Sequence, residues 1–228
     1  MAKIYLSAAA HATDNQTKCN HKCGENIHCN EYMDIVEKRL KELGFEIKRG
    51  DKSKTGDAAL QSRVKEANAW EADLYYVAHT NAGGGRYSMT MCWNDSASIA
   101  KAKVFTKYRK CVKSHKVVTR NDLYEIKHTA MPCMYDELFF HDNAEDCAWF
   151  HNVGMELLAE ETVQALCELC GVTYKAPSTT KDVKVKELES KVKELESKAN
   201  TLQGEVDALK KTISNLNAKI TAAKSALA

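Results

Sequence analysis

Apolar residues in the first three-quarters of the chain follow two alternating patterns. Short runs of apolar, β-favouring residues predict strands, and longer stretches with apolar residues every three or four positions predict amphipathic helices. The expected strands are residues 3–9, 45–48, 74–78, 88–93, 123–126 and 134–140. The expected helices are residues 25–43, 57–70, 96–115 and 143–170, the last with a break near residues 152–154.

The order of these elements predicts the fold class. Strands alternate with helices along most of the chain, which favours an α/β domain with a mixed, mostly parallel sheet flanked by helices. Residues 74–78 (LYYVA) are nearly all apolar, as expected for a central strand covered on both faces. The connection from this strand to residues 88–93 is too short for a helical crossover, so we expect some antiparallel pairing.

The apolar pattern changes after the first predicted domain, residues 1–175. Residues 176–183 have the composition of a linker, and residues 184–228 repeat apolar residues in heptads. β-Branched residues at the first apolar heptad position (a) and leucine at the second (d) favour two parallel strands. We therefore expect a C-terminal helical coiled coil that joins two copies through residues 185–227 as a parallel homodimer. The a positions are Val185, Val192, Ala199, Val206, Ile213, Ile220 and Leu227, and the d positions are Leu188, Leu195, Leu202, Leu209, Leu216 and Ala223.

Composition and charge narrow the range of partners. The formal net charge is +2 and there is no basic block, which argues against a nucleic-acid partner. No apolar segment is long enough for a membrane span, and the first ten residues form too short a run for a secretory signal. The chain has nine cysteines, an odd number, and several lie inside apolar runs, which indicates synthesis in a reducing cytoplasm.

Three potential metal ligands are predicted at one edge of the sheet. His11 follows the first strand, His79 ends the central strand, and Glu25 begins the first long helix. Taken alone, His79 is better explained as a strand-end histidine that binds nothing. However, ligands in open α/β sheets bind outside the carboxyl ends of the strands, so one pocket could collect all three side chains. Two imidazoles and a carboxylate form the ligand set of a hydrolytic zinc site.

A zinc hydrolase also needs a general base, and the predicted strand 134–140 carries two adjacent carboxylates. A carboxylate inside an apolar strand is costly unless it is paired or functional. Asp136 and Glu137 point to opposite faces of a strand, so only one of them can look into the pocket. The pattern does not choose between them.

Four segments resemble a known family: LSAAAHATDN, GENIHCNEYMDIVEKRL, VAHTNA and PCMYDELFFHDNAEDCAW. Over residues 3–175 the chain resembles the zinc-dependent N-acetylmuramoyl-L-alanine amidases of the type 3 amidase family, in particular phage endolysins and bacterial autolysins. The resemblance implies that Zn²⁺ is held by His11, Glu25 and His79 and that Glu137 is the catalytic carboxylate. Glu31 is the alternative to Glu25, and AAAHATD replaces the family's usual P-G-H-G-G around the first ligand.

The resemblance also implies an activity and a location. The expected reaction is hydrolysis of the peptidoglycan amide bond between the N-acetylmuramoyl lactyl group and L-alanine, by zinc-activated water with Glu137 as general base. Asn81, Gly83 and Gly84 are expected to contact the substrate, from their position alone. The missing export signal favours a phage endolysin that is made in the host cytoplasm and acts on the bacterial cell wall.

Three competing hypotheses stay open at this point. A second, structural metal could use a loop rich in cysteine and histidine, namely Cys19, His21, Cys23, His28 and Cys29. A cysteine hydrolase could use Cys133 or Cys147 as nucleophile with His141 or His151 as base. The third is a non-catalytic, wall-binding coiled-coil scaffold.

Overall fold

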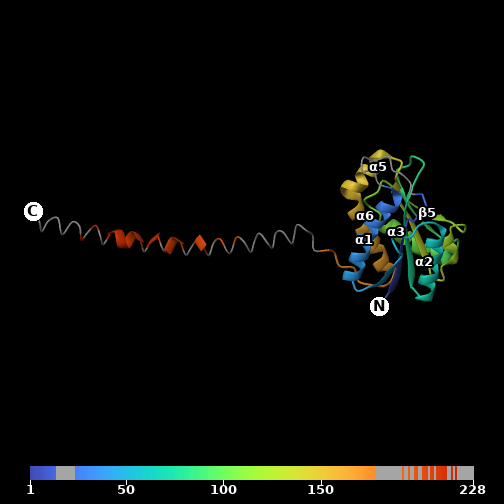
Figure 1. Cartoon of the computed structure of the whole chain (residues 1–228), viewed down its shortest axis with the longest axis horizontal. Coiled ribbons are helices and arrows are strands. Elements are labelled where there is room, and N and C mark those ends of the chain that lie inside the picture. The colour runs from blue at the N-terminus through green and yellow to red at the C-terminus, as the bar shows by residue number, and fades with distance from the viewer. Residues whose placement is uncertain are drawn as a thin grey trace, which may run out of the picture. The chain divides into compact units, whose positions relative to one another are not determined.

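The structure is a computed structural model that describes residues 1–13 and 24–177, together with part of the stretch from Val192 to Lys219. The chain divides into two units, Met1–Lys175 and Ala176–Ala228 (Figure 1). The division of the second unit into a linker at 176–183 and a coiled coil at 184–228 stays a prediction.

The first unit is built on one six-stranded sheet with the order β2-β1-β3-β6-β4-β5. Every neighbouring pair is parallel except β4 with β6. The predicted mixed, mostly parallel α/β sheet is therefore confirmed. The strands are β1 (Lys3–Ala8), β2 (Glu46–Arg49), β3 (Leu74–Asn81), β4 (Ser88–Cys92), β5 (His115–Thr119) and β6 (Cys133–Phe140).

Helices cover both faces of this sheet (Figure 1). One face is covered by α1, α3 and α6, whose apolar residues share a core with alternate strand residues such as Leu6, Tyr76 and Met134. The opposite face is covered by α2 and α4, which pack on the other set of strand residues, including Tyr75 and Tyr135. The helices are α1 (Glu25–Glu42), α2 (Asp57–Ala69), α3 (Ser96–Tyr108), α4 (Tyr124–His128), α5 (Ala144–Trp149), a π-helical turn η1 (Phe150–Gly154) and α6 (Met155–Leu169).

The antiparallel pairing that we expected involves a different partner. The short connection between β3 and β4 suggested that these two strands are neighbours, but β6 lies between them. β4 pairs with β6 in antiparallel register, with Thr90 opposite Asp136. The connection after β3 therefore skips one strand position. As a result, β3 and β6 are the two central strands of the sheet.

Two predicted elements are wrong, and tertiary contacts explain both. The helix expected over residues 96–115 ends at Tyr108, because Arg109 turns inward and the carboxylate of Glu161 accepts hydrogen bonds from the next two backbone amides, each at 2.8 Å. The strand β5 begins at His115, and the sequence pattern did not predict it. Residues 123–126 were expected to be a strand but lie in or next to the short helix α4, which turns Glu125 into the core. There its carboxylate accepts hydrogen bonds from buried hydroxyl groups.

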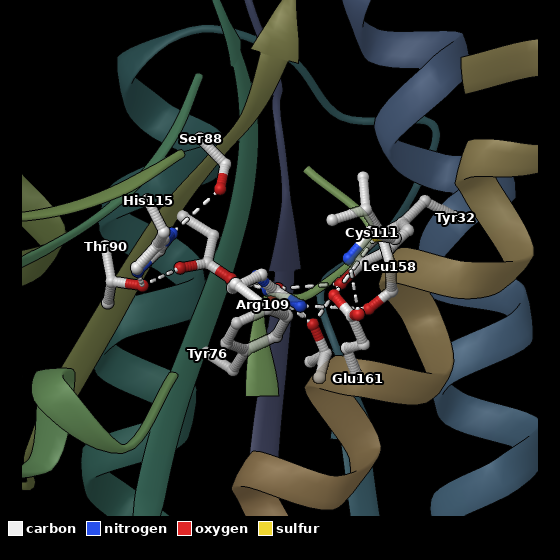
Figure 2. A network of polar contacts seen from close by, with 11 residues as sticks. Tyr32, Tyr76, Ser88, Thr90, Arg109, Cys111, His115, Leu158 and Glu161 are labelled. Carbon is white, nitrogen blue, oxygen red and sulfur yellow. Dashed lines mark hydrogen bonds and ion pairs between the residues drawn. The ribbon is translucent and has the colours of Figure 1, made fainter. Parts of the chain in front are cut away.

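A buried ion pair between Arg109 and Asp136 ties the end of α3 to β6 (Figure 2). Both side chains are only 1% exposed. Asp136 also accepts a hydrogen bond from the hydroxyl group of Tyr76 at 2.8 Å, and Arg109 donates to the hydroxyl oxygen of Thr162 at 2.6 Å and the carbonyl of Leu158 at 3.0 Å. Because the pair is buried and its other polar atoms are largely satisfied, removing one partner would leave an uncompensated charge.

The same network extends to β4 and β5. His115 lies within 2.8 Å of the hydroxyl oxygen of Ser88 and 3.2 Å of that of Thr90, and Thr90 donates to Asp136. Burial lowers the pKa of His115 to about 4, so its imidazole is neutral at physiological pH. Asp136 is therefore the acceptor at the centre of a polar cluster within the core.

In the second unit, all the described residues between Val192 and Lys219 are helical. Six of the apolar side chains predicted at a and d positions are 43–63% exposed, namely Val192, Leu195, Leu202, Val206, Leu209 and Ile213. Of the helices that can be described, none is both long enough and apolar enough to cross a membrane.

Substitution of Arg109 by methionine is expected to lower the free energy of unfolding by about 3–5 kcal/mol, because Asp136 would stay buried without its partner. Urea unfolding followed by circular dichroism measures this change. The control is Arg120→Met, which breaks an ion pair with Asp122 whose side chains are 41% and 67% exposed. It should cost about 0–1 kcal/mol. Equal losses in the two variants would contradict the stabilising role of the buried pair.

Candidate metal centre

Three elements bring the predicted ligands to one edge of the sheet. β1 and β3 are parallel neighbours, so their carboxyl ends lie side by side, with His11 just after β1 and His79 near the end of β3. Glu25 is the first residue of α1. The ligand atoms of these three residues all lie within 4.8 Å of one another. The structure thus assembles the set that the sequence placed there.

The carboxylate of Glu25 bridges the two imidazoles. Its Oε2 lies 3.1 Å from Nε2 of His11, and its Oε1 lies 3.0 Å from Nδ1 of His79. Oε1 also accepts a hydrogen bond from the backbone amide of Thr80 at 2.9 Å. Burial opposes ionisation of Glu25, but the hydrogen bonds from the two histidines and the amide outweigh it and hold its pKa well below the ordinary value. Glu25 is therefore a buried carboxylate kept in its charged form.

The position of His11 is fixed by a residue that the sequence did not single out. The side chain of Asn26 accepts a hydrogen bond from the backbone amide of His11 and donates one to its carbonyl, both at 3.0 Å. Asn26 directly follows Glu25, so the first turn of α1 supplies one ligand and clamps the loop that carries another. In the sequence, the position of Asn26 directly after Glu25 is the one feature that could have drawn attention to it.

One ring nitrogen of His79 is not used in a hydrogen bond within the described residues. Its Nε2 is buried and has no hydrogen-bond partner among the residues that the structure describes. Its ring stacks on Tyr135 at 4.7 Å and meets the His11 ring edge-on at 5.1 Å. A cavity of about 220 Å³ is lined by His11 and His79 together with residues of α2. Glu31, the alternative ligand, is exposed on α1.

Glu137 lies beside this group because of strand register. In the parallel pairing of β3 with β6, Glu137 is opposite His79. Its Oε2 is buried and makes no hydrogen bond within the described part of the chain. Burial raises the pKa of Glu137 to about 7. Asp136 points to the other face of the sheet, so the choice that the sequence left open falls on Glu137.

The glycine turn after β3 is held by its own contacts. The backbone amides of Gly83 and Gly84 both donate to the carboxylate of Asp142, at 2.7 and 3.0 Å. Both glycines have positive φ, 117° and 71°, which other residues rarely adopt. The side chain of Asn81 accepts a hydrogen bond from the amide of Ala82 at 2.8 Å. The turn is thus an ordered, exposed rim next to the centre.

The residues of the rival hypotheses lie elsewhere. Cys133 is buried in the core, and burial raises its pKa far above the ordinary value, which disfavours a thiolate nucleophile. Cys147 lies with His28 and His151, but its side chain is fully buried and cannot reach a polymeric substrate. His141 lies 2.9 Å from the hydroxyl group of Thr80. Cys19, His21 and Cys23 fall outside the described residues.

Comparison with known families identifies the family of the chain. The profile of the N-acetylmuramoyl-L-alanine amidase family Amidase_3 matches residues 8–168. The chain belongs to this amidase family. The match covers the predicted ligands and the carboxylate at 137, so the resemblance stated from the sequence motifs is confirmed. A search of curated proteins finds no match to this chain.

Solved structures agree on the fold of the amidase domain. The catalytic domain of CwlV, an N-acetylmuramoyl-L-alanine amidase from Bacillus (Paenibacillus) polymyxa var. colistinus, superimposes with a TM-score of 0.68 at 22% identity, covering 76% of this chain and 100% of that one. CwlD from Clostridioides difficile, in complex with the GerS lipoprotein, gives 0.67 at 16%, covering 75% and 99%. The catalytic domain of the CD27L endolysin, which targets Clostridia difficile, gives 0.62 at 16%, covering 74% and 98%. At these identities the likeness shows the fold alone.

Substitution of His79 by alanine is expected to remove one equivalent of bound zinc per chain, because it deletes one of the three predicted ligands. Elemental analysis after gel filtration measures the metal content. His128→Ala is the matched control, since His128 is exposed on α4. Unchanged zinc in the His79 variant would exclude His79 as a ligand.

Proposed function

We propose that the amidase domain is zinc-dependent and hydrolyses the bond between the muramoyl lactyl group and L-alanine. Family membership supports peptidoglycan amidase activity. The observation that carries the finer proposal is the convergence of His11, Glu25 and His79, with Glu137 opposite His79 in the strand register. This arrangement supports a metal-binding set and a proton-transfer group at one edge of the sheet.

The residues present fit zinc. Two imidazoles and one carboxylate match the ligand sets of hydrolytic zinc sites. A buried imidazole nitrogen on His79 without a hydrogen-bond partner in the described residues is costly unless something binds it. Bound to these ligands, zinc would supply Lewis acidity to a water molecule and to the amide carbonyl.

Glu137 is suited to transfer a proton from the attacking water to the leaving amine. A pKa near 7 means that the carboxyl group exchanges its proton readily at neutral pH. Its ionised form accepts a proton from the attacking water, and its protonated form delivers that proton to the leaving amine of L-alanine. Burial, which is the largest cause of the raised pKa, also strengthens the electrostatic interactions of this group.

The rim residues Asn81, Gly83 and Gly84 are proposed to contact the substrate. Gly83 and Gly84 are exposed, and their amides are already held by Asp142. Their carbonyl oxygens therefore remain to accept hydrogen bonds from the stem peptide. An ordered turn binds a peptide with a smaller loss of conformational entropy than a mobile one.

The biological role that we propose is lysis of the bacterial wall by a phage endolysin. The four sequence segments resemble phage endolysins as well as bacterial autolysins, and the fold is shared with an endolysin catalytic domain. The tail is proposed to join two amidase domains, which would raise affinity for peptidoglycan through multivalency.

Glu137→Gln is expected to lower the rate of wall hydrolysis by roughly 100- to 10,000-fold, the usual contribution of a general acid–base group. Bound zinc should not change, because Glu137 is not one of the proposed ligands. Release of free amino groups from purified sacculi measures the rate. Glu31→Gln is the control and should hydrolyse sacculi at the wild-type rate. A Glu137 variant with full activity would refute the assigned role.

The full chain is expected to sediment as a dimer in analytical ultracentrifugation, because an isolated helix would leave the apolar seam exposed. Val206→Glu together with Ile213→Glu places charges in the seam and should give a monomer. Lys211→Glu lies outside the a and d positions and should leave the dimer intact. A monomeric wild-type chain would overturn the proposal.

A further inference from the structure

Outside the catalytic centre, a second group of metal-ligating side chains comes together from distant parts of the chain. His28 lies on α1, Cys147 on α5 and His151 on η1. One ligand atom from each lies within 4.8 Å of the other two. Nε2 of His28 and Nε2 of His151 face one another at 2.9 Å. We propose that these three residues bind a second metal ion, of the zinc class, with a structural role.

The chemistry of the three side chains favours a metal. A thiolate and two imidazoles suit zinc, and the charge of the thiolate offsets part of the charge of the ion. Metal binding would release the thiol proton of Cys147 to solvent and would use the lone pairs of both imidazoles. In a plain hydrogen bond between two neutral imidazoles, only one nitrogen can accept. The 2.9 Å separation of the two Nε2 atoms fits such a hydrogen bond, which binding of an ion would replace with two metal–nitrogen bonds.

Burial points to the same conclusion. His28 and Cys147 are fully buried, and the His28 ring packs against Phe139 and Phe150 at 5.9 and 6.0 Å. A charged imidazole among aromatic rings is costly, whereas a metal-bound imidazole stays neutral. His151 is only half-buried, so an ion can reach the group from solvent.

The backbone around His151 is unusual in a way that supports a site. The helix that runs from α5 to α6 widens into the π-helical turn η1, which contains His151. Such π-turns are frequently found at functional sites. The turn ends at Gly154, where a Cβ would lie 2.8 Å from the ring of Trp149. The chain therefore keeps a glycine to accommodate the wide turn between Cys147 and α6.

The proposed site would stabilise the catalytic centre by linking two of the elements that form it. His28 lies one helical turn after Glu25, so an ion bound to it would tie the start of α1 to the segment that follows β6. That segment leads directly from the strand that carries Glu137. The second ion would therefore hold together the two elements that supply a catalytic ligand and the catalytic carboxylate.

Metal content of the full chain is the first test. Apoprotein reloaded with zinc and passed through gel filtration should hold about two zinc ions per chain. Cys147→Ala, His151→Gln and His79→Ala should each lose one of these. Cys167→Ala is the matched control, a buried helical cysteine outside both described clusters, and should lose none. Circular dichroism verifies that each variant is folded.

Cobalt substitution separates this inference from the proposed function. Only the second site contains a thiolate, so the thiolate-to-cobalt charge-transfer absorption should appear in wild type, in His79→Ala and in Cys167→Ala. It should be absent from Cys147→Ala. Failure of the proposed catalytic site would appear as unchanged metal in His79→Ala, with the cobalt band still dependent on Cys147. A wild-type protein without the band, or a Cys147 variant that keeps it, would overturn the second site.

Discussion

The parallel pairing of β3 with β6 is the constraint on which the centre depends. It places Glu137 opposite His79, and the neighbouring pairing of β3 with β1 places His11 at the same edge. Since residues alternate between faces along a strand, this register also sends Asp136 into the core. A shift of one residue would exchange the two carboxylates and turn Glu137 away from His79.

The two faces of β6 use their carboxylates in opposite ways. Asp136 has a full set of partners in Arg109, Tyr76 and Thr90, which makes it a structural acceptor. Glu137 has a buried oxygen without a hydrogen-bond partner among the described residues, and burial raises its pKa. Satisfied polar groups stabilise a fold, whereas a buried, unsatisfied group with a shifted pKa is typical of residues that act in binding or catalysis. The buried network around Asp136 holds β6 in place, and this fixes the position of Glu137 opposite His79.

Sequence patterns predicted the parts of the fold that depend on local chemistry. The apolar runs located β1, β3 and β6, and the polar residues within or just after these runs located His11, His79 and the two carboxylates of β6. What the patterns missed depends on long-range contacts. The end of α3 at Tyr108 depends on Arg109 reaching Asp136, and the helical state of α4 accompanies the burial of Glu125. The clamp of Asn26 on His11 joins residues whose proximity no local pattern encodes.

In the proposed centre, His11, Glu25 and His79 hold one zinc ion beside Glu137. Anomalous diffraction from crystals of the zinc-loaded protein, recorded on both sides of the zinc absorption edge, tests it most directly. We expect an anomalous peak within bonding distance of all three side chains, with the carboxylate of Glu137 facing it. Zinc-loaded crystals without a peak between these residues would contradict this arrangement.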